Sequence, residues 1–271
     1  MNTQDNQRPL ISIITVNLND IKGLKKTLLS IITQNFRNFE HIIIDGGSSD
    51  GSREFISANQ QKISYWVSET DKGIYNAMNK GILKASGTYL MFLNSGDYLY
   101  SQEALTHLVI EAANCDLVYG NMLVEENTGM RRQIYPAELD FLHFYSGHSL
   151  PHQATLIKKI LFDKIGFYNE SFKIVSDWEF FINAVSLHNA SYKYVDADIA
   201  VFATGGMSAL PANTHLYAAE RQQTYQKYYQ AFLPLLAAKA VVERELRLIK
   251  SSRLHRLAAG ISKLFAKNKN A

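Results

Sequence analysis

Between residues 10 and 97, short apolar runs alternate with segments whose apolar residues recur at helical spacing. The runs are rich in β-branched and aromatic residues, and they cover residues 10–16, 39–44, 63–67 and 89–93. Such runs are typical of strands that are covered on both faces. The helical segments between them cover roughly residues 20–33, 53–58 and 73–84. This alternation predicts an α/β fold with a doubly wound, mainly parallel sheet.

Polar residues follow each of these strands. Asn17 and Asn19 follow the first strand, Asp45 the second, Asp71 the third, and Asn94 and Asp97 the fourth. Because the carboxyl ends of parallel strands meet at one edge of a sheet, we expect these side chains to lie close together. Open α/β sheets bind their ligands at that edge, so the sequence predicts a ligand site there.

The loop at residues 45–52, DGGSSDGS, departs from two familiar nucleotide-binding motifs. Gly46 and Gly51 have the glycine spacing of a phosphate-binding loop, but Ser52 and Arg53 replace its Lys-Ser/Thr pair. The first predicted helix is not opened by the G-x-G-x-x-G pattern either. The loop is instead rich in residues that turn tightly and let backbone amides approach a ligand.

Beyond residue 100 the pattern changes. A helix at 101–113 and a strand at 116–119 precede two extended pieces around residues 127–129, which predict a small antiparallel annex. A further helical segment ends near Gly166, another helix begins near Ser176, and residues 192–202 have an extended pattern. We expect helices again after residue 210.

Composition limits the classes of protein that this chain can be. With 271 residues, 46% of them hydrophobic and 11% aromatic, the chain can bury a large core. The stretch MNTQDNQRPL lacks the features of a signal peptide, and no run approaches the roughly 20 apolar residues that span a bilayer. We therefore expect a cytoplasmic protein. Cys115 is the single cysteine, which excludes an intrachain disulfide framework.

Five landmarks follow one another along the chain: ISIITVNLN, IIIDGGSSDGS, an E-x-D-x-G-x-Y-x-A-x-N-x-G run from Glu69 to Gly81, FLNSGD and SDWEF. With them, residues 9–210 resemble the inverting nucleotide-sugar glycosyltransferases of family 2, which have the GT-A type of fold. Within that family the chain is similar to enzymes that build bacterial surface polysaccharides such as O-antigen and capsule. The resemblance implies a glycosyltransferase domain at 1–210, with a nucleotide-binding half (1–119) and an acceptor-side half (120–210).

The resemblance also implies roles for individual residues. The nucleotide-sugar donor is expected at Val16, Asn17, Asn19, Asp45, Asp71, Gly73, Asn94 and Asp97. Asp97 matches the metal-binding carboxylate of the family's acidic DXD motif and would hold Mg²⁺ or Mn²⁺, although Asn94 and Gly96 stand where many members have acids. Asp177 matches the catalytic base. Gly46 and Ser176 also replace acids that are frequent in the family.

The acceptor is expected near His148, His152 and Trp178. Each has another interpretation, because the histidines can be loop residues or metal ligands, and Trp178 can belong to the core. Asp97 and Asp177 can likewise cap the helices that follow them.

General chemistry agrees with the two carboxylate roles. A hard cation on Asp97 would neutralise charge on a departing diphosphate, and a carboxylate opposite it would take the proton of the attacking hydroxyl. The sequence thus predicts a metal-dependent inverting hexosyltransferase, with a donor that is expected to be UDP-linked and an acceptor glycan that is expected to be lipid-linked. The alternatives are a non-catalytic nucleotide-sugar or glycan binding subunit and, less favoured, a nucleotidyltransferase.

The C-terminal extension, residues 211–271, differs from the rest of the chain. Residues 221–271 contain eleven Lys and Arg against two Glu. Between residues 244 and 267 the apolar and basic residues are spaced as in a basic amphipathic helix, which can lie on anionic lipid as a peripheral membrane contact. The alternatives are a helix docked on its own domain or in a homodimer. Nucleic acid is not expected, because the basic residues are confined to this tail.

Overall fold

The computed structural model of this protein describes residues 8–126, 128–204 and 213–251. The chain divides into two compact units, residues 1–220 and 221–271. The domain division at residue 210 that the resemblance implied stays a prediction, because residues 205–212 lie outside the described ranges.

One mixed β-sheet runs through the first unit, with the strand order β3-β2-β1-β4-β8-β6-β9-β5 and with β7 paired to β6. Its described strands are β1 (Ile11–Asn17), β2 (Phe39–Asp45), β3 (Tyr65–Ser68), β4 (Tyr89–Phe92), β5 (Tyr98–Leu99), β6 (Leu117–Glu126), β7 (Gly129–Gln133), β8 (Thr155–Lys158) and β9 (Tyr192–Ala203). Strands β1 to β4 are parallel to one another. Strand β8 then pairs antiparallel with both β4 and β6.

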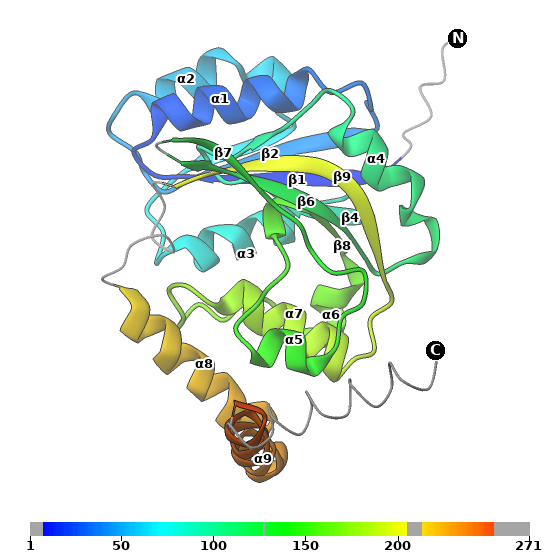
Figure 1. Cartoon of the computed structure of the whole chain (residues 1–271). Coiled ribbons are helices and arrows are strands. Elements are labelled where there is room, and N and C mark those ends of the chain that lie inside the picture. Colours follow the sequence, from blue (N-terminus) through cyan, green and yellow to red (C-terminus); the bar gives the residue numbers. More distant parts are fainter. Residues whose placement is uncertain (1–7, 127, 205–212, 252–271) are drawn as a thin grey trace, which may run out of the picture. The chain divides into compact units, whose positions relative to one another are not determined.

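Helices cover both faces of this sheet (Figure 1), so the predicted doubly wound α/β architecture is confirmed. On one face lie α1 (Ile21–Ile32) and α2 (Ser52–Ala58), and on the other lie α3 (Ile74–Lys84), α5 (Phe141–Tyr145), α6 (Ile160–Ile165) and α7 (Ser176–Ser186). Helix α4 (Ala104–Ile110) packs against β9. Helix α8 (Thr214–Tyr228) begins in the first unit and ends in the second, which also contains α9 (Leu233–Ser251).

The core explains how the first helices are oriented. Ile11 and Ile13 of β1 point into the same apolar cluster as Ile31 of α1. Ile14 points to the opposite face and meets α3, where a Cβ atom on Gly81 would lie 2.4 Å from its Cγ2 atom. Glycine at this position therefore lets α3 pack closely on β1, which brings the amino end of α3 to the carboxyl edge of the sheet.

Strand β6 differs from the sequence-based prediction. Residues 116–119 were expected to form one strand and residues after 120 a separate hairpin, but β6 continues through both. Its pairing with β9 shifts register between Tyr119 and Asn121. A Cβ atom on Gly120 would lie 2.5 Å from Ile199 Cγ1, so glycine is needed where the two strands approach. The predicted antiparallel hairpin exists as β6 and β7, and it is part of the one sheet.

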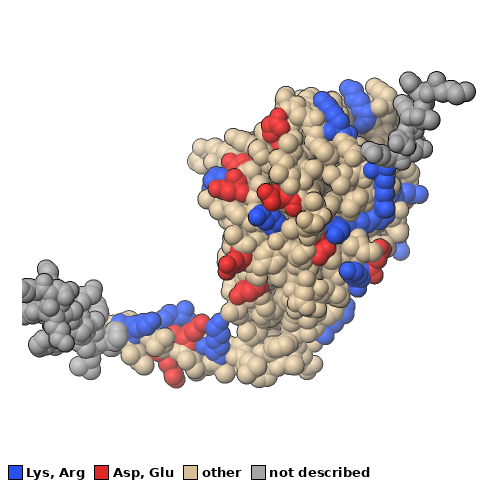
Figure 2. All heavy atoms as spheres, turned by 90° about the vertical axis from the view of Figure 1, so that its right-hand side faces the viewer, with Lys and Arg blue, Asp and Glu red and all other residues tan. Residues whose placement is uncertain are grey.

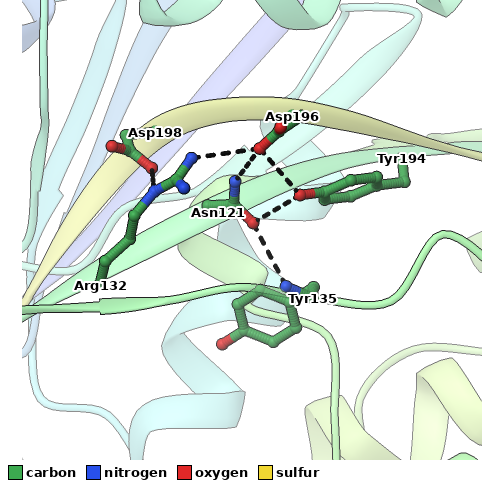
Figure 3. Close-up of polar contacts among 6 residues, drawn as sticks. All are labelled: Asn121, Arg132, Tyr135, Tyr194, Asp196 and Asp198. Atoms are coloured by element: carbon green, nitrogen blue, oxygen red, sulfur yellow. Dashed lines mark hydrogen bonds and ion pairs between the residues drawn. The ribbon is translucent and has the colours of Figure 1, made fainter.

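A buried asparagine holds this irregular part of β6 (Figure 3). Asn121 has no exposed surface, and its Oδ1 atom accepts hydrogen bonds from the Tyr194 hydroxyl at 2.9 Å and from the Tyr135 backbone N–H at 3.2 Å. Its Nδ2 atom donates to Asp196 at 3.0 Å, and Arg132 pairs with Asp196 and Asp198 beside it. These bonds fix the segment that follows β7, which includes Tyr135.

Candidate active site

The loop after β2 is organised by Asp45, which has no exposed surface. Its carboxylate accepts hydrogen bonds from Asn17 Nδ2 at 2.7 Å, from Ser48 Oγ at 2.6 Å and from Ser68 Oγ at 2.6 Å. Burial raises the pKa of Asp45, but the donors on Ser48, Ser68 and Asn17 outweigh burial and lower that pKa. The direct nucleotide contact expected at Asp45 stays a prediction, and in this structure the carboxylate organises its own loop.

The end of β1 carries a buried oxygen without a partner. Asn17 is 3% exposed, and its Oδ1 atom has no hydrogen-bond partner among the described residues. Asn19, with a φ of 52°, binds the neighbouring loop, since its backbone N–H donates to Ser48 Oγ at 2.7 Å. Val16, just before, is 7% exposed. A buried acceptor without a donor is costly, so Asn17 Oδ1 is suited to a donor group on a ligand.

Asp71 lies beside the glycine that follows Asp45. A Cβ atom on Gly46 would lie 2.5 Å from Asp71 Oδ2, so a larger residue at position 46 would push Asp71 aside. The other oxygen, Oδ1, accepts from the backbone N–H of Gly73 at 2.9 Å. Gly73 has a φ of +125°, which favours glycine, and it directly precedes α3. Gly46 stands where an acid is frequent in the family, and Asp71 brings a carboxylate close to that position from another loop.

Asp97 lies in the loop that follows the carboxyl end of β4, and it is 4% exposed. Its Oδ2 atom accepts from Gln153 Nε2 at 3.1 Å, and its Oδ1 atom accepts from the backbone N–H of Ala203 at 3.0 Å. Burial raises the pKa of Asp97 to about 6, although the donors on Ala203 and Gln153 and the charge of His152 act in the opposite direction. The ionised form of Asp97 is therefore only partly stabilised by this chain.

These properties fit a metal that is shared with a bound donor. No group of three His, Cys, Asp or Glu side chains that could hold a metal occurs in the described ranges. Mg²⁺, however, is commonly held by one or two carboxylates together with substrate phosphates. A cation at Asp97 would supply the positive charge that its buried carboxylate lacks, and two hydrogen bonds leave lone pairs on the carboxylate free.

Asn94 precedes Asp97 by three residues and lies beside His152. Its Oδ1 atom is buried and has no hydrogen-bond partner in the part of the chain that is described. Its Nδ2 atom lies 3.4 Å from His152 Nε2. The loop that carries Asn94 and Asp97 is fixed to α1, because the Thr27 hydroxyl donates to the backbone oxygen of Asp97 at 2.6 Å.

Asp177 lies in the first turn of α7, whose N-cap position is Val175. Asp177 Oδ1 accepts from the Tyr75 hydroxyl at 3.0 Å, and Asp177 Oδ2 lies 2.9 Å from His152 Nδ1. Burial raises the pKa of Asp177, but the hydrogen bond and charge of His152 and the hydroxyl of Tyr75 outweigh burial and lower it. The segment before α7 is held by Glu220, which accepts from the backbone N–H of Val175 at 3.1 Å.

The capping interpretations are therefore wrong for both carboxylates. Asp177 lies inside the first turn of α7, and α4 has Glu103 rather than Asp97 at its N-cap position.

A cleft of about 500 Å³ adjoins Asp177. Its lining includes His148, His152, Asp177, Tyr135, Phe202 and Tyr217. Beside it the rings of His143 and His148 are stacked with their centroids 5.2 Å apart. The predicted acceptor residues His148 and His152 thus lie in one cleft with Asp177.

Trp178 does not belong to this cleft. Its side chain is 1% exposed and its indole N–H donates to the backbone oxygen of Phe144 at 3.2 Å. The acceptor role expected for Trp178 is corrected to a role in the core, because Asp177 and Trp178, as neighbours on a helix, point in different directions.

Sequence reasoning missed two residues of this site, Tyr75 and Gln153. Tyr75 is the tyrosine of the E-x-D-x-G-x-Y run, so its signal was present in the motif. Gln153 had no signal except its position next to His152. Its contact with Asp97 depends on how residues 56 positions apart come together in the fold.

Comparisons with known proteins agree with this fold. The profile of Glycosyl transferase family 2 matches residues 12–176. The PGL/p-HBAD biosynthesis glycosyltransferase of Mycobacterium bovis is 31% identical over 207 residues, which cover 74% of this chain and 79% of that protein.

Two solved structures are similar in fold. S. aureus TarS 1–349 in complex with UDP-GlcNAc has a TM-score of 0.59 and 20% identity, with 71% of this chain and 58% of that chain covered. The mannosyltransferase PcManGT from Pyrobaculum calidifontis, in complex with GDP-Man and Mn²⁺, has a TM-score of 0.54 and 14% identity, with 97% and 89% covered. At these identities the similarity shows the fold alone.

The sheet, with polar groups gathered at its carboxyl edge beside a cleft, is that of a glycosyltransferase with the GT-A type of fold. This chain belongs to glycosyl transferase family 2, as its motifs predicted.

Proposed function

We propose that this protein transfers a sugar from a nucleoside diphosphate sugar to an acceptor glycan with inversion, as a step in building a bacterial surface glycan. The observation that carries the proposal is a link between two carboxylates. His152 contacts Asp177 at 2.9 Å, and the next residue, Gln153, donates to Asp97 at 3.1 Å. Two adjacent residues thus hold Asp97, which can bind a cation on the donor, and Asp177, which can accept a proton.

Asp177 is the proposed general base. It lies in the lining of the cleft, where the hydroxyl of an acceptor glycan can reach it. Removing the hydroxyl proton as the oxygen attacks the anomeric carbon makes that oxygen a better nucleophile, and attack opposite the departing diphosphate inverts the configuration. His148, on the same cleft, is the proposed contact for the acceptor.

The donor is proposed to bind along the carboxyl edge of β1, β2 and β4. The Oδ1 atoms of Asn17 and Asn94, which have no partner among the described residues, support this placement, because hydroxyl or N–H groups of a nucleotide sugar can donate to them. Asp71 and Gly73 extend the same edge. A UDP-linked donor is favoured by the TarS complex with UDP-GlcNAc.

Asp97 is the proposed metal ligand. When bound, Mg²⁺ or Mn²⁺ neutralises negative charge on the diphosphate as it leaves. The raised pKa of Asp97, about 6, supports this role, because a buried carboxylate of this kind is ionised most readily beside a cation. The Mn²⁺ in the mannosyltransferase complex is consistent with it.

A thermal-shift panel tests the donor and the metal together. We expect UDP and one UDP-sugar to raise the melting temperature in the presence of Mn²⁺, since a ligand at a hundred times its Kd adds about 2.7 kcal/mol to stability. GDP, CMP and dTDP serve as controls. A UDP shift without any effect of Mn²⁺ would contradict the metal assignment. No shift with any nucleotide would contradict the donor site, and a shift without any sugar transfer would favour a binding subunit.

The acceptor is proposed to be lipid-linked, with α9 lying on the membrane surface. Of the helices that the structure describes, none has the length and apolar character to cross a bilayer. The helix α9 has exposed apolar residues, among them Leu235, Val242 and Ile249, and it carries both basic and acidic side chains (Figure 2). The basic stripe predicted from the sequence continues to residue 267. Its part beyond residue 251 lies outside the described ranges.

Vesicle binding tests this surface contact with the full chain. The full-length protein is expected to co-sediment with vesicles that contain phosphatidylglycerol. Reversing Arg244, Arg247 and Lys250 to Glu should weaken binding on the order of 10²-fold or more, since each basic residue contributes about 1 kcal/mol near an anionic surface. Reversing the exposed Lys22, Lys62 and Lys164 is the matched control. Equal binding of both triple variants, or no binding by the wild type, would refute the proposal.

A further inference from the structure

The two carboxylates of the site are connected by one short turn. His152 and Gln153 begin a 3₁₀ turn (His152–Ala154) that leads directly into β8. Gln153 is 5% exposed, and the side chain of His152 is 16% exposed. Because β8 is paired with β4 on one side and β6 on the other, this turn is anchored in the middle of the sheet.

The donors and acceptors around His152 determine where its proton lies. Asp177 can only accept when it is ionised, so His152 Nδ1 carries the hydrogen that points to Asp177 Oδ2. On the other side of the ring, Asn94 Nδ2 can only donate, and it lies 3.4 Å from His152 Nε2. The contact with Asp177 therefore places a hydrogen on Nδ1, while Asn94 lies beside Nε2.

Asp177 is held from two sides. The Tyr75 hydroxyl donates to one oxygen and His152 to the other, so rotation of the carboxylate about its last bond would break both contacts. The donors come from α3 and from the turn before β8, which both pack against the central strands of the sheet. Such a carboxylate keeps one orientation toward the cleft, and well-oriented reacting groups lower the barrier of a reaction.

We propose that His152 is a positioning residue for the base: its Nδ1–H fixes the carboxylate of Asp177 in the orientation that receives the acceptor's proton. This inference rests on the proposed function, in which Asp177 is the base. It changes the role that the sequence suggested for His152, from a contact for the acceptor to a support for Asp177.

Two substitutions separate this role from others. In His152→Asn the side-chain amide can donate from nearly the position of Nδ1, so the bond to Asp177 is kept while Nε2 is lost. In His152→Leu the volume is similar but both nitrogens are lost. We expect kcat to fall no more than about tenfold in His152→Asn and on the order of 10²-fold in His152→Leu. KM for donor and acceptor should change little in either variant.

The pH profile gives a readout that a purely structural role would not move. The titratable groups that face this pair are Tyr75, Tyr168 and Asp97. Loss of the Nδ1–H donor removes stabilisation from the ionised carboxylate, so the acid limb of kcat/KM should move to higher pH in His152→Leu and stay near its place in His152→Asn.

Four outcomes would overturn the inference. If His152→Asn were as inactive as His152→Leu, Nε2 would itself take part in the reaction. If both variants matched the wild type, His152 would position nothing. A rise in acceptor KM alone would return His152 to the acceptor site, and an acid limb that stayed in place in both would point to a structural role. The proposed function fails separately, if Asp177→Asn keeps full activity.

Discussion

Replacing Asp97 with Asn is expected to abolish metal-dependent transfer and, at the same time, to stabilise the metal-free protein. Activity should fall on the order of 10²- to 10³-fold, because a bound cation commonly contributes several kcal/mol to charge stabilisation in the transition state. Stability should rise because the ionised carboxylate of Asp97 is buried at 4% exposure, without a cation in the metal-free protein. The amide can keep both contacts, since its oxygen can accept from Ala203 and the amide group of Gln153 can turn to accept from its nitrogen.

The direction of the pH dependence follows from the pKa. The pKa of Asp97 is about 6 in the folded protein and 3.8 in the reference state, so between these values the folded protein keeps a proton that the unfolded chain has lost. The free energy of unfolding therefore falls as pH rises through this window, by about 1–3 kcal/mol in total. The stability difference between Asp97→Asn and the wild type should widen from pH 4 to pH 6 and stay constant above it.

Urea unfolding of both metal-free proteins at several pH values would measure this difference. His41 affects the wild type in the opposite direction, because burial lowers its pKa to about 3 and its protonation destabilises the fold as pH falls below 6.5. His41 is present in both proteins, so its effect cancels in the comparison. Asp163→Asn, at an exposed position of α6, is the control for loss of the same charge. A destabilised Asp97→Asn protein with undiminished, Mn²⁺-dependent transfer would contradict the whole assignment.

The sequence predicted the first half of the fold well because its signals are local. Strands β1, β2 and β4 are continuous apolar runs, and Asp20 caps α1 by accepting from the backbone N–H of Gly23 at 2.9 Å. Strands β5 and β8 were missed. They have two and four residues, and they become strands only because distant partners lie alongside them.

Site residues could be proposed from the sequence where their position directly after a strand, or in a motif, determines where they lie. They were missed where contacts between distant segments of the chain determine where they lie. Asp97 and Asp177 were proposed from motifs, and the fold brings their surroundings together through His152 and Gln153. The burial of Asp45 could not be predicted, because the donors that surround it come from three separate segments of the chain. The burial that raises the pKa of Asp97 was also hidden, since it depends on β9, which pairs antiparallel with β5 and brings Ala203 close to Asp97.

Asp177→Asn is expected to lower kcat about 10²- to 10⁴-fold while leaving donor binding intact, because only proton transfer is lost. The variant should fold, since its oxygen can accept from His152 and the Tyr75 hydroxyl can turn to accept from the new amide. UDP with Mn²⁺ should raise its melting temperature as in the wild type.

Single-turnover transfer assays across pH separate this loss from a binding defect. The acid limb of kcat/KM should disappear in Asp177→Asn, because the group that must be ionised is gone. Tyr75→Phe is a graded control: it removes one donor from the carboxylate, so the pKa of Asp177 should rise and the acid limb should move to higher pH with only a modest loss of rate. A folded Asp177→Asn protein with near-normal kcat would show that the proton leaves by another route. The pairing of Asp177 with two donors would then serve only to hold α7 against α3.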